Sequence, residues 1–153
     1  MTSPRWLSPA EMRAWRGFIE VVDRLTIHME ADLAVHGLTL GDYQVLVYLS
    51  ESQDHRMRMT DLADLLILSP SGLTRRLDGL VKAGYVVRER CADDKRVNWA
   101  SLTDSGFRRL QEVAPEHVES VRRHFIDRLT ADQIESIGEI FETLRPEDGD
   151  SRG

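Results

Sequence analysis

Apolar residues recur with helical spacing near the middle of the chain. They fall at positions i, i+4, i+7 and i+8, which are Leu73, Leu77, Leu80 and Val81. This spacing predicts one apolar stripe on a helix. Ser69 is a favourable N-cap, Pro70 suits the first helical position, and Gly84 supplies the left-handed residue that ends a helix. The pattern therefore predicts a capped amphipathic helix between Ser69 and Gly84.

The hydrophobic period changes from about 3.6 to about 2 residues immediately after this helix. Residues 85–90 and 97–102 alternate in this way and predict two short strands around the polar tip 91–96. A shorter helix with Leu62 and Leu66 precedes the capped helix. Together these elements predict a winged helix-turn-helix, in which the capped helix is the one that reads DNA.

The polar face of the capped helix carries short hydroxyl donors at its start and two guanidinium groups behind them. These residues are Ser69, Ser71, Thr74, Arg75 and Arg76. Small residues permit close approach to a major groove, and Arg binds guanine edges or phosphates. An ordinary solvated helix face is the alternative interpretation. The capped start, the hydroxyl groups and the basic hairpin that follows favour DNA contact.

Two further apolar patterns predict long helices toward the ends of the chain. Ser8 and Glu11 form a capping box, and the apolar spacing continues to Gly37. The apolar positions of this first helix are Trp15, Phe18, Ile19, Val22, Leu25, Met29 and Leu33. The last helix, after a capping box at Thr130, carries Ile134, Ile137, Phe141 and Leu144. A wide apolar face on a long helix favours packing against a second subunit, with burial inside a monomer as the alternative.

The remaining segments complete a mainly α fold with a small β-wing. Thr39 and Asp42 cap a second helix, and residues 54–58 predict a polar connection whose final Arg stands where a capping residue is expected. Thr103 opens another helix. Its expected inner face is Phe107, Leu110, Val113, Val118, Val121 and Phe125. We therefore expect a single domain over residues 1–153, with six helices and a two-stranded wing.

Several motifs recur here with fixed spacing. The hairpin contains Arg88, then Asp94-Lys95-Arg96 at its tip, and then Leu102-Thr103-Asp104-Ser105-Gly106 opening the next helix. The helix-turn-helix contains Leu62-Ala63, and Ser69, Ser71, Thr74 and Arg75. These motifs resemble the wing and helix-turn-helix patterns of the MarR family of bacterial transcription regulators. The spacings agree throughout, and the flanking helices extend the resemblance over nearly the whole chain.

The resemblance implies a domain organisation and a quaternary structure. It implies a homodimer with dimerisation helices at about 8–36 and 103–145 and a winged helix-turn-helix at about 39–102. In many members of the family a small-molecule pocket lies between these two regions. Trp15 and Tyr43, on the first two helices, could line such a pocket for an aromatic or anionic effector. Ordinary core packing is the stronger expectation for each aromatic side chain.

The resemblance also assigns roles to residues of the wing. In the MarR family the Arg of the D-x-R motif tends to enter the minor groove while the Asp holds it, which implies these roles for Arg96 and Asp94. Arg75 matches the Arg position of the family's reading helix, whereas Arg76 has no such match and is expected on a phosphate. The full set expected to contact DNA is Ser69, Pro70, Ser71, Thr74, Arg75, Arg76, Arg88, Asp94, Lys95 and Arg96.

Charge is distributed unevenly along the chain. Taken alone, the net charge of −6 argues against a nucleic-acid partner. Residues 56–96, however, contain nine Lys or Arg against six Asp or Glu, a local charge of +3, while the remainder carries −9. Attraction to phosphates needs a local basic surface rather than a basic protein. The asymmetry therefore supports a DNA partner.

The composition excludes several other classes of protein. The 153 residues suit one domain, and no apolar run approaches the length of a membrane span. No signal peptide is visible, and a single cysteine, Cys91, is consistent with the cytoplasm. Basic neighbours could make Cys91 oxidisable, but a passive surface thiol is favoured. No nucleophile elbow, phosphate loop or clustered metal ligands are present, so neither an enzyme nor a cofactor or metal site is expected.

The histidines form two pairs with helical spacing. His28 and His36 are eight residues apart, and His117 and His124 are seven apart. Metal ligation would need tighter clustering, so these histidines are expected to face solvent or an interface. The function that the sequence supports best is a cytoplasmic, homodimeric, sequence-specific DNA-binding repressor of a pseudo-palindromic operator. A winged helix that binds another protein, without direct DNA readout, is the alternative.

Overall fold

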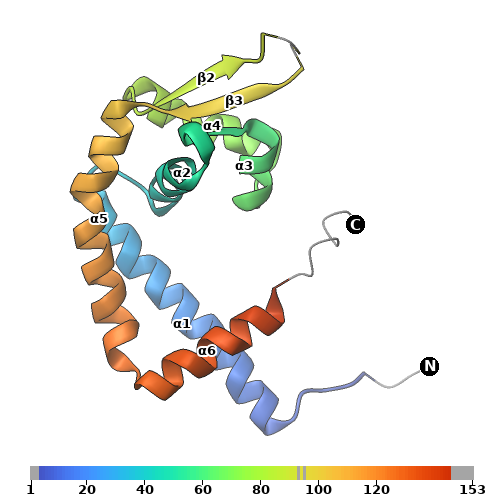
Figure 1. Cartoon of the computed structure of the whole chain (residues 1–153). Coiled ribbons are helices and arrows are strands. Elements are labelled where there is room, and N and C mark those ends of the chain that lie inside the picture. The colour runs from blue at the N-terminus through green and yellow to red at the C-terminus, as the bar shows by residue number, and fades with distance from the viewer. Residues whose placement is uncertain (1–3, 93, 95, 146–153) are drawn as a thin grey trace.

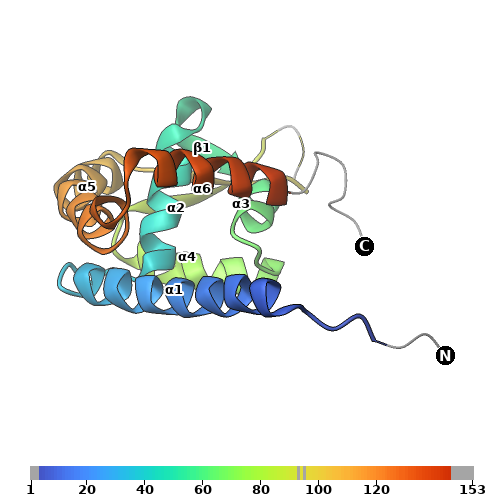
Figure 2. The ribbon, with the colours of Figure 1, turned by 90° about the horizontal axis from the view of Figure 1, so that it is seen from below.

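Helices and strands gather at two ends of the molecule in the computed structural model, which describes residues 4–92, 94 and 96–145 (Figure 1). The helices of this described part are α1 (Pro9–Ala34), α2 (Leu40–Glu51), α3 (Met59–Leu65), α4 (Pro70–Lys82), α5 (Asp104–His124) and α6 (Ala131–Leu144). The strands are β1 (Arg56–Arg58), β2 (Val86–Arg90) and β3 (Asn98–Leu102). One end holds α2, α3, α4 and the sheet, the other holds α6 and most of α1, and α5 runs between them (Figures 1 and 2).

Side-chain caps fix where the helices begin. Ser8, Thr39 and Thr130 each form a capping box, and the hydroxyl groups of Ser69 and Thr103 each accept one free N–H group in the first turn of α4 and α5. These caps are local, and the sequence predicted all five. After α4, the backbone turns into β2 through a glycine with φ of +78°, the left-handed conformation expected at this position.

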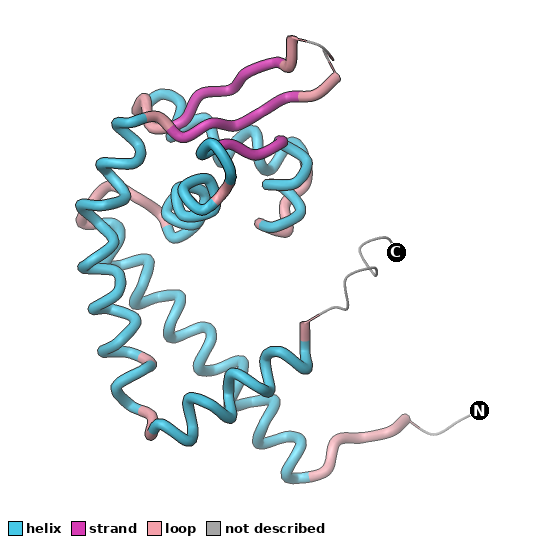
Figure 3. The backbone as a smooth tube through the Cα atoms, viewed as in Figure 1, coloured by secondary structure: helices cyan, strands magenta, loops and turns pink. Residues whose placement is uncertain are grey.

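The sheet has three strands, so the prediction of a two-stranded wing was wrong. Arg56–Arg58, expected to be part of a polar connection, forms β1 and pairs antiparallel with β3, giving the strand order β1-β3-β2 (Figure 3). Met57 lies opposite Ala100, a buried residue. Three residues are too short to show a period of two, and their pairing partner is about 40 positions away along the chain. The adjoining Gln53–His55 forms a 3₁₀ turn.

The hydrophobic core lies within the winged-helix end. Its buried residues are Leu33, Leu38, Tyr43, Val45, Leu46, Leu49, Leu62, Ala63, Leu73, Leu77, Leu80, Val86, Ala100, Leu110 and Val113. On α1 only Leu33 is buried, and α6 buries none of its residues. Trp15, Phe18 and Val22 on α1 are more than two-fifths exposed, so the part of the apolar face that they form is not buried within a single chain. No helix among the described residues is long and apolar enough to span a bilayer.

The inner face of α5 differs from the predicted one at both ends of the helix, since Phe107, expected on it, is 37% exposed. Leu110 and Val113 are buried as expected, but Val118 is 54% exposed, whereas Ser120 is buried. The chain places polar residues on the inward side here, and apolar periodicity cannot detect a polar inner face. Helix α5 is continuous through Pro115.

Candidate nucleic-acid interface

Helix α4 turns its apolar stripe into the core and leaves its polar face exposed. The buried residues of the stripe are Leu73, Leu77 and Leu80. At the start of the helix, the Ser69 hydroxyl accepts the Gly72 N–H at 3.1 Å and lies 3.3 Å from the Ser71 hydroxyl. The Thr74 hydroxyl donates to the Pro70 carbonyl at 3.0 Å. These exposed hydroxyl groups are held close to the helix surface, so no long side chain prevents the start of α4 from entering a DNA groove.

The two adjacent arginines of α4 have different surroundings. Arg75 is exposed and has no hydrogen bond or ion pair with any described residue. Arg76 is one-third exposed, and its Nη1 donates to the Thr39 hydroxyl at 2.9 Å and lies 3.8 Å from the Asp42 carboxylate. Its guanidinium group also lies against Gly41, where no side chain intervenes. Arg76 therefore joins α4 to the start of α2, and a phosphate contact by this residue stays a prediction.

Arg88 joins the wing to α4. Its Nη2 forms an ion pair with Asp78 and donates to the Thr74 carbonyl at 3.3 Å. Both partners lie on α4, whereas Arg88 is in the middle of β2. The bonds hold the hairpin at a fixed angle to the helix, since a guanidinium group has several donors in a rigid plane.

The wing tip presents an oriented arginine. One carboxylate oxygen of Asp94 accepts the Arg96 backbone N–H at 3.0 Å and its Nε at 3.2 Å. These hydrogen bonds, from the backbone first and then from the side chain, lower the pKa of Asp94 from its ordinary value. The Arg96 side chain is 92% exposed, so its terminal nitrogens point into solvent. Lys95, also expected to contact DNA, lies outside the described residues.

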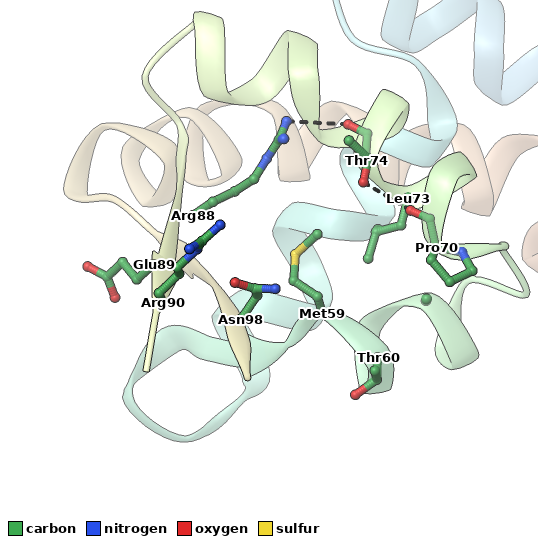
Figure 4. A pocket seen from close by; sticks show the side chains of 10 residues that line it. Met59, Thr60, Pro70, Leu73, Thr74, Arg88, Glu89, Arg90 and Asn98 are labelled. Carbon is green, nitrogen blue, oxygen red and sulfur yellow. Dashed lines mark hydrogen bonds between the residues drawn. The ribbon is translucent and has the colours of Figure 1, made fainter. Parts of the chain in front are cut away.

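A cavity of about 470 Å³ separates the wing from the helix-turn-helix (Figure 4). It is lined by Met59, Thr60, Ala63, Pro70, Leu73, Thr74, Arg88, Glu89, Arg90 and Asn98. Met59 and Arg88 point toward the same space from opposite sides, whereas Glu89 points away from it. The cavity adds Arg90 and Asn98 to the polar residues of this side of the molecule, and the sequence did not predict either of them as site residues.

Two further arginines lie on the outer face of the sheet. Arg56 and Arg58 on β1 lie over the ring of Trp99 on β3, with guanidinium carbons 4.7 and 5.8 Å from the ring centroid. A cation–π arrangement of this kind orients both side chains at the surface. The sequence did not predict this arrangement, because the three residues of β1 are too few to show a strand period.

The structure does not bring Trp15 and Tyr43 together. Trp15 stacks on Phe18 with ring centroids 6.3 Å apart and is 54% exposed. Tyr43 is buried against the His117 ring at 4.2 Å, and burial raises the pKa of its phenol. The expectation of core packing is therefore confirmed for Tyr43. Cys91 is a half-buried free thiol at the end of β2.

The histidines pair between helices rather than along them. The rings of His28 on α1 and His124 on α5 stack with centroids 4.0 Å apart. His36, in the turn after α1, lies 2.6 Å from a carboxylate oxygen of Glu116 on α5. No group of three His, Cys, Asp or Glu side chains in the described part of the chain is arranged to hold a metal ion. His28, His36 and His124 therefore belong to the contact of α5 with α1 and the turn that follows α1, whereas His117 packs against Tyr43 on α2.

The helix-turn-helix, the antiparallel sheet beside it and the exposed arginines of both define a winged helix-turn-helix of the DNA-binding class. Comparison with known proteins narrows this class. The sequence profile of the MarR family matches residues 36–97. AbsC, a MarR family transcriptional regulator from Streptomyces coelicolor, is 42% identical, with 92% of this chain and 95% of AbsC covered and a TM-score of 0.87.

Two other relatives agree with this result. Sco3205, a MarR family transcriptional regulator from Streptomyces coelicolor solved in complex with DNA, is 39% identical, with 98% and 97% of the two chains covered and a TM-score of 0.89. The transcriptional repressor YetL of Bacillus subtilis (strain 168) is 27% identical, with 90% of this chain and 84% of YetL covered. The chain belongs to the MarR family, whose members are transcriptional regulators and not enzymes.

Proposed function

We propose that this protein is a cytoplasmic, homodimeric repressor that reads a pseudo-palindromic operator through α4 and the wing. One observation carries the proposal: Arg75 on α4 and Arg96 at the wing tip stay exposed, while Arg76 and Arg88 bond within the protein. Two bonded arginines fix the angle between helix and hairpin, and two free ones are available for DNA. Sco3205, crystallised with DNA, provides independent support for the nucleic-acid partner.

The contacts follow from the chemistry of the grooves. Arg75 offers a bidentate fork to a guanine edge in the major groove, where base pairs are distinguishable. Arg96, oriented by Asp94, enters the minor groove, where groove width rather than base identity attracts an arginine. The hydroxyl groups of Ser69, Ser71 and Thr74 lie at the start of α4, the part of a reading helix that approaches the bases and phosphates most closely.

Dimerisation would proceed through residues 8–36 and 103–145, leaving residues 39–102 as the DNA-reading unit. The apolar side chains that α1 and α6 leave exposed support this division. They include Trp15, Phe18, Ile19 and Val22 on α1 and Ile134, Ile140, Phe141 and Leu144 on α6. Exposed apolar surface of this extent marks an interaction site. With one DNA-reading unit per subunit, the half-sites would lie about one helical turn apart.

Footprinting on the DNA upstream of the protein's own coding region tests the proposal, followed by titration of the protected fragment at several salt concentrations. A repressor gives a footprint with two-fold symmetry and an affinity that falls steeply with salt, because phosphate contacts release counterions. A winged helix that serves only as a protein-interaction module gives no footprint and no steep salt slope. We also propose that a small molecule relieves repression by this protein.

A further inference from the structure

The first turn of α2 is bonded to two other helices. From α1, the Glu30 carboxylate accepts the backbone N–H of Leu40, the first residue of α2, at 3.0 Å. From α4, Nη1 of Arg76 donates to the Thr39 hydroxyl at 2.9 Å and lies 3.8 Å from the Asp42 carboxylate. The start of α2 therefore lies between the N-terminal helix and the helix that we propose to read DNA.

The two groups that hold Arg76 are also the two members of the capping box of α2. The Thr39 hydroxyl accepts the Asp42 N–H at 3.0 Å, and the Asp42 carboxylate accepts the Thr39 N–H at 3.0 Å. Both acceptors of Arg76 thus keep their places only while the first turn of α2 is formed. The bond from Glu30 supports this turn, because the N–H groups of a first helical turn have no partner within the helix. The Glu30 side chain is half-buried, so its bond is partly shielded from water.

The space for Arg76 depends on a glycine in the same turn. A Cβ atom added at Gly41 would overlap the Arg76 guanidinium group. That group is the far end of a flexible side chain, so a residue larger than glycine would displace the guanidinium group rather than α2. Glycine inside a helix is unfavourable relative to alanine. Gly41 therefore lowers the local stability of α2 while it makes the contact with α4 possible.

Bonds to α2 and to the wing hold α4 on opposite flanks. Residues two positions apart on a helix lie about 200° apart around its axis. Arg76 bonds to α2 on one flank, and Asp78 pairs with Arg88 of the wing on the other. Arg75 lies between these flanks and is exposed. Loss of the bond on one flank would therefore allow α4 to rotate about its axis and would change the direction of Arg75.

We propose that Glu30 is a positioning residue for DNA reading, which acts through the first turn of α2 and Arg76 on the orientation of α4. In this arrangement the Arg76 guanidinium group binds α2 instead of the phosphate expected from the sequence. The effect on DNA affinity rests on the proposed function, whereas the link from Glu30 to Arg76 is independent of it.

The NMR signals of the Arg76 guanidinium group in the full-length protein test this link without DNA. Glu30→Ala should move these signals toward those of a free arginine and speed their exchange with solvent. Glu30→Gln keeps an oxygen that can accept the Leu40 N–H, so it should retain the wild-type signals. Glu51→Ala removes a carboxylate from the exposed last residue of α2 and is the matched control, which should leave the signals unchanged. Signals unaffected by Glu30→Ala would overturn the proposal.

The affinity of the same variants for the operator tests the effect on reading. Glu30→Ala, Gly41→Ala and Arg76→Ala should each weaken binding about three- to tenfold with an unchanged dependence on salt, because no phosphate contact is lost. Gly41→Ala combined with Arg76→Ala should bind no more weakly than Arg76→Ala alone, since the added methyl group then has no guanidinium group to displace. In the same background Gly41→Ala should raise the melting temperature, because alanine favours the helix.

Three results of the DNA titrations would overturn the proposal. The first is that Arg76→Ala lowers the salt slope by about one phosphate contact, which would place Arg76 on the DNA backbone. The second is that Gly41→Ala weakens binding equally with and without the guanidinium group. The third is that Glu30→Ala binds as the wild type does. A wild-type protein that binds no operator would contradict the proposed function and with it the effect on reading, while the Arg76 signals would still decide the link.

Discussion

At the scale of single residues, the arginines of the winged helix divide into two that bond within the protein and two that stay exposed. Arg76 and Arg88 are each about one-third exposed and bond to neighbouring elements, whereas Arg75 and Arg96 are exposed. We propose that the first two have a structural role and that the second two contact DNA. Substitutions at the four positions should therefore differ in kind as well as in size.

Arg75→Ala should relax sequence discrimination at one base position. The substitution removes a bidentate arginine–guanine pair. The binding free energy should weaken by about 1–3 kcal/mol for operators with the cognate base at that position, and by less for operators with any of the other three bases. Affinities for operators altered one base pair at a time within the half-site provide the measurement. An unchanged order of preference among these operators would contradict the placement of α4 in the major groove.

Arg96→Ala should weaken binding without changing half-site preference. The loss should be largest on operators with A·T-rich flanks, because a narrow minor groove attracts an arginine most strongly. Asp94→Ala should have the same effect in milder form, since it frees the Arg96 side chain rather than removing it. Operators altered only in the flanks serve as the test, and a change in half-site preference would show that the wing is misplaced.

Arg88→Ala should weaken binding to all operators about equally, and Asp78→Asn should reproduce much of that loss. Both changes break the bond that holds β2 against α4, yet Asp78→Asn keeps the cation. The effect on the free energy of unfolding should be small, about 0.2–1 kcal/mol, because the pair is partly exposed. If Asp78→Asn binds DNA as well as or better than the wild type, Arg88 acts on phosphate instead of on α4.

At the scale of elements, the sequence predicted what depends on near neighbours. Caps such as Ser69 and Thr103 act within four residues, and the stripe of α4 repeats over three turns, so both were visible in the chain. The pairing of β1 with β3 and the bond from Arg76 to Thr39 join residues about 40 positions apart. Such contacts depend on tertiary packing, which composition and periodicity do not encode.

The contact between α1 and α5 is a second example. The expectation that the histidines face solvent or an interface holds only in part, since His28 and His124 stack within one chain. Neither ring lies on an apolar stripe, and their spacing of 96 positions shows no pattern. Ser120, on the same face of α5, is buried although it is polar. The positions of apolar residues therefore do not mark the buried face of this part of α5.

This contact should make the protein less stable in mild acid. Burial lowers the pKa of His117, opposed by Asp32, and burial is also the main reason that the pKa of His124 is lowered. The unfolded chain therefore binds more protons as pH falls through about 6.5, so the free energy of unfolding decreases. Chemical denaturation between about pH 7.5 and about pH 5.5 measures the slope. A double variant, His117→Gln with His124→Gln, should flatten it, and an unchanged slope would contradict this account.

At the scale of the whole molecule, the core and the apolar faces that α1 and α6 leave exposed lie at different ends. The winged helix contains the buried core, while α6 buries no residue at all. A buried core at one end and exposed apolar helix faces at the other are the pattern expected of one subunit of an oligomer rather than of a monomeric protein.

Ile137→Asp combined with Phe141→Asp should abolish both dimerisation and specific DNA binding. Charged side chains on α6 would have to be buried without partners in the dimer. Sedimentation at micromolar concentration gives the oligomeric state, and circular dichroism shows whether the winged helix remains folded. Ile67→Asp, at a position 92% exposed in the turn before α4, is the control and should leave the dimer intact. A folded wild-type monomer under these conditions would contradict the dimer.

The continuity of α5 has a mechanical consequence. Its 21 residues start beside the wing, end where His124 stacks on His28 of α1, and span about 30 Å. A rigid rod of that length, tilted by about 5°, moves its far end by roughly 2.5 Å, close to the length of one hydrogen bond. In a symmetric pair the displacement occurs twice, in opposite directions. A small adjustment among α1, α5 and α6 would thus be amplified into a change in the distance between the two α4 helices of such a pair. The spacing of the DNA grooves that these helices would enter is fixed.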